Sequence, residues 1–259
     1  MSKTRLTFLG TGTSQGVPMI GCGCKVCSST DPRDKRLRAS VYVEYEGLRI
    51  LVDAGPDFRQ QMLREGISGV DAILLTHNHK DHTGGLDDIR AFNYIEKKAT
   101  QIYCEKYVED SLRQEYSYAF AENKYPGAPE WEVHNIDGNP FEIEGRRIIP
   151  IRGRHFRLPV LGYRFGDIAY CTDMNSIPEE EFCKLEGLDH FIINCVRRGR
   201  HISHFSLEGA LEVAAKVGAR HTWLTHLSHQ LPAYEALAAE LPVNVLPAFD
   251  GLVIESEDR

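Results

Sequence analysis

Three histidines and one aspartate fall within six residues of this chain, directly after an apolar run. Residues 72–76 read as a buried strand, and the polar residues that follow it are His77, His79, Asp81 and His82. Imidazole and carboxylate groups suit borderline divalent ions, and a loop at a strand end can direct several of them at one point. A solvated His-rich turn is the alternative, but three of only eleven histidines lie in these six positions. The segment therefore predicts a metal site at the edge of a sheet.

Strands and helices alternate along the rest of the chain. Apolar alternation and β-branched residues predict strands at 6–9, 41–45, 49–52, 72–76, 101–104, 141–151, 162–165, 168–172, 191–196 and 221–225. Helical spacing predicts helices at 57–64, 86–97, 105–120, 206–217 and 233–240. Because no linker or low-complexity stretch divides the sequence, we expect one domain over residues 1–259, of the α/β class, with sheets covered by helices.

Composition and charge limit the size of the core, the kind of partner and the cellular compartment that we expect for this chain. At 259 residues and 42% hydrophobic content it can bury a full core. The formal net charge of −7 disfavours a general nucleic-acid partner, and an odd set of seven cysteines fits a reducing compartment better than a disulfide framework. The apolar runs are strand-sized and the first ten residues break too early for a secretory signal. We therefore expect a soluble, cytoplasmic protein that does not enter a membrane.

Four further metal-ligand or support candidates each follow a predicted strand or lie just beyond one. They are Asp53, His155, Asp173 and His226. Each alone could be a turn or cap residue. Together with the loop at 77–82, they form a pattern that turn chemistry does not explain.

In this order the residues resemble the signature of the metallo-β-lactamase fold superfamily, a His-x-His-x-Asp-His loop with separate later ligands. The resemblance covers nearly the whole chain and implies a four-layer αββα sandwich with two divalent ions, zinc or manganese, at one edge. It implies that the first ion is bound by His77, His79 and His155, the second by Asp81, His82 and His226, and that Asp173 bridges both. Asp53 would act behind the ligands, orienting one of them or the bridging water.

A second cluster places the thiols of Cys22, Cys24 and Cys27 within six residues. Three thiolates need one more ligand to close a tetrahedral site, and His229 is the candidate. Free cysteines in a flexible loop are one alternative; a redox pair is another, without a thioredoxin-like context around it. The arrangement resembles that of the cyclic ribose-phosphate phosphodiesterases of bacterial phosphonate degradation, which implies one structural zinc.

A third element is the tract at 197–204, which precedes the predicted helix at 206–217. In phosphodiesterases of the superfamily, a histidine at this place contacts the scissile phosphate and protonates the leaving oxygen. His204, 22 residues before His226, matches this role better than His201, although either could be a plain neighbour of the helix N-terminus. His201, Arg198 and Arg200 are the candidates for substrate binding. With the arginines around His155, they suit a phosphate-bearing substrate, although many surface arginines have no such role.

The resemblance implies a dinuclear phosphodiesterase that cleaves a small phosphodiester, such as a cyclic ribose 1,2-phosphate or a nucleotide, by attack of a metal-bridging hydroxide. A homodimer is an expectation from the family, and the irregular stretch at 118–129 is a candidate substrate lid. The alternatives are a tRNA 3′-processing-like endonuclease, a thioesterase or lactonase, and a non-catalytic metal-binding protein. Residues 173–226 leave little room for the arm of the tRNA enzymes, few residues follow His226 for a thioesterase extension, and no ligand is missing.

Overall fold

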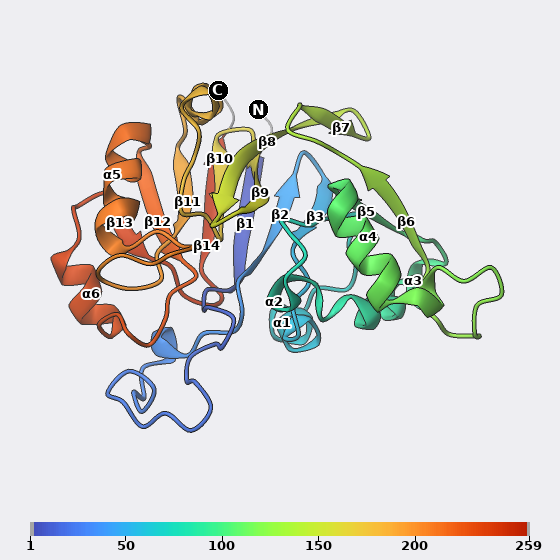
Figure 1. Ribbon diagram of the computed structural model, residues 1–259, viewed down its shortest axis with the longest axis horizontal. Coiled ribbons are helices and arrows are strands. Elements are labelled where there is room, and N and C mark those ends of the chain that lie inside the picture. The colour runs from blue at the N-terminus through green and yellow to red at the C-terminus, as the bar shows by residue number, and fades with distance from the viewer. Residues whose placement is uncertain (1–2, 258–259) are drawn as a thin grey trace.

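Two seven-stranded sheets pack face to face in the computed structural model, which describes residues 3–257 (Figure 1). The first sheet has the order β14-β1-β2-β3-β4-β5-β6 and the second β13-β12-β11-β10-β9-β8-β7. In each sheet the first three pairings from one edge are antiparallel and the other three are parallel. The two halves of the chain therefore repeat one strand plan, and the final strand returns to pair with β1.

The strands are short and mostly buried, as expected for sheets covered on both faces. Those of the first sheet are β1 (Lys3–Gly10), β2 (Ser40–Tyr45), β3 (Leu48–Val52), β4 (Ala72–Leu74), β5 (Thr100–Cys104), β6 (Trp131–Asn135) and β14 (Val253–Glu257). Those of the second sheet are β7 (Phe141–Ile143), β8 (Arg146–His155), β9 (Leu158–Phe165), β10 (Ile168–Cys171), β11 (His190–Asn194), β12 (His221–Thr225) and β13 (Val245–Pro247).

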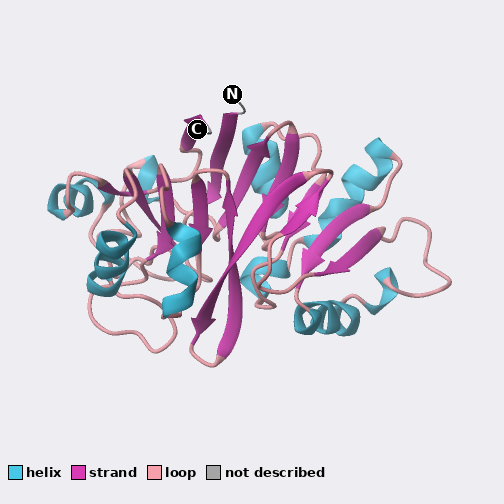
Figure 2. Ribbon diagram, turned by 90° about the horizontal axis from the view of Figure 1, so that it is seen from above, coloured by secondary structure: helices cyan, strands magenta, loops and turns pink. Residues whose placement is uncertain are grey.

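The helices lie on the outer faces of the two sheets (Figure 2). The α-helices are α1 (Phe58–Glu65), α2 (Lys80–Thr83), α3 (Arg90–Glu96), α4 (Lys106–Glu115), α5 (Leu207–Val217) and α6 (Tyr234–Glu240). The 3-10 helices are η1 (Pro32–Asp34), η2 (Leu86–Ile89), η3 (Ser117–Ala119) and η4 (Glu179–Leu185). No described helix is long and apolar enough to cross a membrane.

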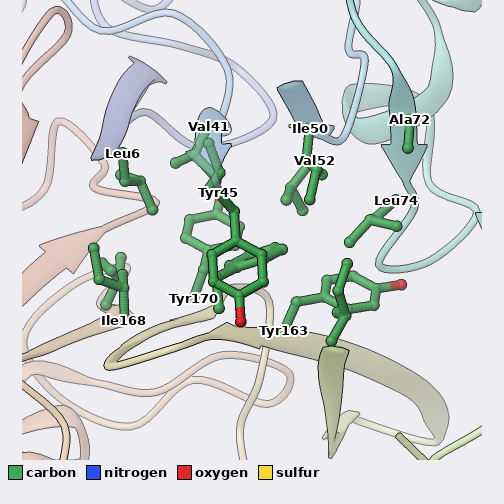
Figure 3. Close-up of a cluster of buried hydrophobic side chains, with 14 of the residues drawn as sticks. Leu6, Val41, Tyr45, Ile50, Val52, Ala72, Leu74, Tyr163, Ile168 and Tyr170 are labelled. Atoms are coloured by element: carbon green, nitrogen blue, oxygen red, sulfur yellow. The ribbon is translucent and has the colours of Figure 1, made fainter. Parts of the chain in front are cut away.

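Side chains from both sheets fill the layer between them (Figure 3). Val41 and Ile50 of the first sheet, for example, share one buried cluster with Tyr163 and Tyr170 of the second. Separate apolar clusters join the outer face of each sheet to its helices. This αββα arrangement confirms the predicted fold class.

Several predicted boundaries were wrong. The strand predicted at 141–151 is a hairpin, because the chain reverses between β7 and β8 at Glu144 and Gly145, whose φ values are 48° and 79°. The helix predicted at 86–97 divides into η2 and α3, and the one predicted at 105–120 ends at Glu115 before η3. Strands β6, β13 and β14 were missed. Their apolar patterns are short, and each is specified by pairing with a strand distant in sequence or by covering a sheet edge.

The parallel strands place the functional loops at one edge of the molecule. Carboxyl ends of neighbouring parallel strands share an edge, so the loops after β3, β4, β10, β11 and β12 meet there. The β8–β9 hairpin joins this edge because the amide of Arg154 donates to the Ser176 carbonyl at 3.0 Å, which links it to the loop after β10. The predicted catalytic metal ligands lie in these loops and at the end of β8.

Candidate active site

Three candidate site residues share an unusual backbone conformation at the ends of their strands. Asp53, Asp173 and His226 follow β3, β10 and β12 with φ of 64°, 57° and 54°. Non-glycine residues seldom adopt this left-handed region, and when they do, they are often at functional sites. All three are buried, so the sharp turn at each strand end sets a polar side chain inside the protein.

One group of candidate ligands is drawn tightly together. It contains Asp81, His82, Asp173 and His226, whose nearest ligand atoms all lie within 4.8 Å of one another. His82 Nε2 is 3.2 Å from Asp173 Oδ2 and 3.3 Å from Asp81 Oδ2. His226 Nε2 is 3.1 Å from Asp173 Oδ1. The two oxygens of Asp173 thus face different histidines.

A second group consists of three imidazoles next to the first. The ring of His79 lies 4.6 Å from that of His77 and 4.9 Å from that of His155, measured between centroids. Asp173 also shares a ligand-sized cluster with His155 and His204. The structure therefore brings all seven predicted catalytic ligands to one place, with Asp173 between the two sets.

The donor set fits divalent metal ions. The Nε2 atoms of His77, His82 and His226 are buried and have no hydrogen-bond partner among the described residues. A buried imidazole nitrogen without a partner is destabilising unless something binds its lone pair. Imidazole nitrogens facing carboxylate oxygens meet the preference of ions such as zinc.

Hydrogen bonds behind the ligands orient the imidazoles. His82 Nδ1 lies 2.6 Å from Asp53 Oδ2, and Thr76 donates to Asp53 from its amide and its hydroxyl, both at 2.9 Å. Because the Thr76 hydroxyl donates to Asp53, it accepts from His77 Nδ1, 2.9 Å away. His155 Nδ1 donates to the Ser203 carbonyl at 2.9 Å. In each case the Nε2 atom remains available as a ligand.

Thr76 is a site residue that the sequence analysis did not identify. Its place between the strand and His77 was visible, but a threonine at the end of a strand has no distinctive signature. Asn175 was also missed: it accepts from the amide of Phe156 and donates to the Ile202 carbonyl, at 3.1 and 3.0 Å. It therefore ties the β8–β9 hairpin to the loop that carries His204.

The charges of the ligand groups are strongly coupled. Burial disfavours a charge on His82, but the carboxylates of Asp173, Asp81 and Asp53 outweigh burial and hold the pKa of His82 well above its usual value. The pKa of His226 is raised to about 9 because Asp173 and Asp81 also outweigh burial there. Despite burial, His226 and His82 hold the pKa of Asp173 well below its usual value. The pocket is thus built to hold positive charge beside Asp173.

His204 lies beside both groups of ligands. Its ring is 4.5 Å from that of His155 and 4.7 Å from that of His226, between centroids. Its Nδ1 is 3.7 Å from Asp173 Oδ1. Burial and the nearby His226 charge lower the pKa of His204 to about 3, so the ring alone is neutral at pH 7. A phosphate anion beside it would favour the protonated form.

Three cavities open beside the ligands. The first, of about 1080 Å³, is lined by the loop before α5 and by α5 itself, including Arg200 and His204. The second, of about 780 Å³, is lined by the β8–β9 hairpin together with His79 and His155. The third, of about 240 Å³, runs between His226 and His229. The ligand loops are therefore reachable from several directions.

The predicted substrate-binding residues separate in the structure. Arg200 and His201 line the first cavity, as does Arg197. Arg198 instead forms an ion pair with Glu240 of α6 and lines none of the described cavities, so the structure does not bring it to the site. The predicted lid at 118–129 is irregular, but its described cavity contacts are with Tyr94 and its neighbours, away from the ligands.

The cysteine cluster lies in the long loop between β1 and β2, which projects from the body (blue in Figure 1). Cys22, Cys24 and Cys27 group with His229, whose Nδ1 lies 3.3 Å from Cys22 Sγ and 3.5 Å from Cys24 Sγ. The Cys27 amide donates to Cys24 Sγ, and with His229 this lowers the pKa of Cys24 to about 6. Burial raises the pKa of Cys27 to about 11. Four ligands around one point fit a tetrahedral zinc site.

The family of the chain follows from comparison with known proteins. The family model described as the beta-lactamase superfamily domain matches residues 48–227, which contain every residue of the two ligand groups. The chain belongs to the metallo-β-lactamase superfamily of hydrolases. This confirms the resemblance seen in the sequence.

Two solved structures superpose on nearly the whole length of this chain. A new diphosphatase from the PhnP family superposes with a TM-score of 0.92 at 41% identity, covering 99% of this chain and 98% of that one. Zinc-bound PqqB from Methylobacterium extorquens superposes with a TM-score of 0.76 at 19% identity, covering 96% and 99%. The second likeness is one of fold alone.

Curated relatives carry different names. An octanoyltransferase of Porphyromonas gingivalis is 42% identical over 251 residues, 96% of this chain but 51% of that protein. The chain thus spans about half the length of that relative. A ribonuclease Z of Pyrobaculum neutrophilum is 26% identical, over 90% of this chain and 89% of that protein.

Proposed function

We propose that this protein is a dinuclear metal-dependent phosphodiesterase that hydrolyses small phosphodiesters. The observation that carries the proposal is the position of Asp173, with one oxygen toward His82 and the other toward His226, and with His204 beside it. The diphosphatase and ribonuclease names of two relatives support chemistry at phosphorus. The fold alone does not select a substrate.

Seven residues would hold the two ions, zinc or manganese. His77, His79 and His155 would bind one, Asp81, His82 and His226 the other, and Asp173 both. When bound, the ions would acidify water and offset negative charge on the phosphoryl oxygens. Asp53 keeps His82 in the ligand orientation through its 2.6 Å contact. The cysteine cluster would hold a third, structural zinc.

His204 would supply the proton that the leaving oxygen needs. It lines the first cavity and stands next to Asp173, so a phosphate at the ligands would lie within its reach. The positive charges of Arg197 and Arg200 on the same loop favour an anionic substrate. The pKa of His204 must rise when phosphate binds, as the charge of the anion favours the imidazolium.

The test of this role compares leaving groups. We expect His204→Ala to lower kcat by about 10²–10⁴-fold for dithymidine phosphate, whose leaving alkoxide needs a proton. For thymidine 5′-(p-nitrophenyl) phosphate the loss is much smaller, since p-nitrophenolate leaves without one. His221→Ala, on an exposed histidine at the start of β12, is the matched control. Equal losses with both substrates would contradict the role as a general acid.

The octanoyltransferase name belongs to a protein about twice as long as the matched region. Octanoyl transfer is therefore measured beside phosphodiester hydrolysis on metal-loaded protein. We expect turnover of the phosphodiester and none of the acyl donor. Failure on every phosphodiester, with good turnover of an acyl donor, thioester or lactone, would overturn the proposal.

A further inference from the structure

The mouth of the site is divided by two exposed apolar side chains. Phe156 and Ile202 are 49% and 66% exposed, and both line the first and the second cavity. Exposed apolar groups at a cavity mouth are suited to contact the organic part of a ligand. We call these two residues the ridge.

The ridge is held in place by the loop that carries Asp173. Asn175 accepts from the Phe156 amide at 3.1 Å and donates to the Ile202 carbonyl at 3.0 Å. Phe156 has a φ of 58°, an uncommon conformation for a bulky residue. The backbone of the ridge is therefore tied to the loop that carries Asp173.

The two cavities reach different residues of the site. His204 lines the first cavity, whereas His79 and His155 line the second. A phosphate at Asp173 would thus have one cavity on the side of His204 and another on the side of His79 and His155. A cyclic diester carries both ester oxygens on one organic group, which would fill a single cavity.

Resting on the proposed function, we infer that the substrate is a linear phosphodiester with a sizeable organic group on each side. In the reaction, the oxygen of water bonds to phosphorus and that water releases one proton to solvent. The bond to the leaving oxygen breaks, and the leaving oxygen takes the proton of His204. The leaving group therefore lies in the first cavity, against the loop at 197–204 and α5. The retained group lies in the second cavity, lined by Phe156, Arg157 and Leu158.

The walls of the two cavities differ in chemistry. Besides the shared ridge, the first is lined by Arg197, Arg200 and His201 of the loop and by Glu208 and Glu212 of α5, which suits a polar leaving group such as a sugar. The second adds Leu158 to the ridge, with the Arg157 guanidinium 5.2 Å from the centre of the Phe156 ring. This wall suits a flat or apolar retained group.

The test uses two esters with the same leaving group. Thymidine 5′-(p-nitrophenyl) phosphate has a large retained group, and methyl p-nitrophenyl phosphate has a small one. We expect kcat/KM to be about tenfold or more higher for the thymidine ester, because the second cavity contacts its retained group. 2′,3′-Cyclic nucleotides are expected to be poorer substrates than the thymidine ester.

Two substitutions on exposed side chains separate the cavities. Arg157→Trp narrows the second cavity, and we expect it to reduce the preference for the thymidine ester over the methyl ester. Glu212→Trp narrows the first cavity, and we expect it to lower kcat/KM for both esters by the same factor. Leu63→Trp, on a 65% exposed residue of α1 away from the cavities, is the matched control and changes neither rate. Calorimetry of thymidine 5′-monophosphate adds a readout independent of turnover: Arg157→Trp weakens its binding but not that of methyl phosphate.

The possible failures are distinct. Equal kcat/KM for the two esters, or an unchanged ratio in Arg157→Trp, would overturn the two-cavity inference and leave the proposed function intact. A ratio that falls in Glu212→Trp instead would overturn the assignment of groups to cavities. If the metal-loaded protein hydrolyses neither ester, the proposed function fails and the inference fails with it.

Discussion

At the scale of single residues, Asp53 acts through His82 rather than on a substrate. Its carboxylate is fully buried, accepts two hydrogen bonds from Thr76, and lies 2.6 Å from His82 Nδ1. Asp53→Asn is informative because asparagine tolerates the left-handed backbone that residue 53 adopts. The substitution removes the negative charge without requiring a new backbone conformation.

We expect Asp53→Asn to weaken metal binding by about 10–100-fold, measured by competition with a chelator. The matched control is Asp57→Asn, which loses a bond to Arg38 outside the ligand groups. An unchanged metal affinity in Asp53→Asn would show that the orientation of His82 does not depend on this carboxylate.

His190 offers a pH-dependent contribution to stability away from the site. Its Nδ1 accepts from Trp223 Nε1 at 3.1 Å, and its Nε2 faces the Glu255 carbonyl at 3.1 Å. This arrangement requires the neutral ring, and burial lowers the pKa of His190. Because the folded-state pKa is the lower one, the stabilisation is present above the ordinary pKa of about 6.5 and is lost as pH falls.

We therefore expect the difference in unfolding free energy between wild type and His190→Gln to shrink as pH falls from about 7 to about 5. Urea unfolding at each pH measures it. Comparing the two proteins removes the contributions of other histidines. A difference that stays constant over this range would mean that His190 does not titrate as its surroundings indicate.

At the scale of elements, the sequence predicted those features that depend on neighbouring residues in one short segment. The run of His77, His79, Asp81 and His82 after a strand is readable because ligand type and spacing sit in one short segment. The hairpin of β7 and β8 could not be predicted from the sequence, because its turn at Glu144 and Gly145 is only a short break in a continuous apolar pattern.

The roles of residues that act through tertiary contacts could not be predicted from the sequence. Arg198 and Arg200 are two positions apart, yet one pairs with Glu240 and the other lines a cavity. Asn175 joins two loops 19 and 27 residues away, and no periodicity marks it. These roles depend on how the loops after β10 and β11 pack against other elements, which the sequence alone does not show.

At the scale of elements we also expect the segment that carries Cys22, Cys24 and Cys27 to depend on its zinc for order. The apolar cluster beside these cysteines is small and centres on Val17 and Val26. We expect Cys24→Ser to lose one zinc per chain, read by mass spectrometry under native conditions. We also expect a lower thermal midpoint, by about 2–4 °C for each kcal/mol lost. Cys183→Ser, on an exposed cysteine, is the control. Retention of the zinc in Cys24→Ser would remove Cys24 from the site.

At the scale of the whole molecule, the two ligand groups join the two sheets. The loop at 77–82 follows β4 of the first sheet, whereas His155 ends β8 of the second sheet, and Asp173 and His226 follow β10 and β12 of that sheet. Bound ions would therefore hold the two halves together at this edge. Binding to the folded state alone stabilises by about 4 kcal/mol at a free ion concentration 1,000-fold above Kd.

Removal of the ions should consequently lower the thermal midpoint by about 10 °C, read by calorimetry with and without chelator. The Cys24→Ser protein separates this effect from that of the structural zinc. A midpoint that chelation does not move in this variant would show that the ligand groups do not bind ions tightly.

A metal titration tests most directly whether two ions at the ligand groups support hydrolysis. Metal-free protein receives zinc or manganese while bound ions and hydrolysis of bis(p-nitrophenyl) phosphate are followed together. We expect turnover to reach its maximum at two ions per chain beyond the one held by the cysteine cluster, and we expect Asp173→Asn to lose both the ions and the turnover. Full turnover with fewer ions, or no turnover with all of them bound, would contradict this expectation.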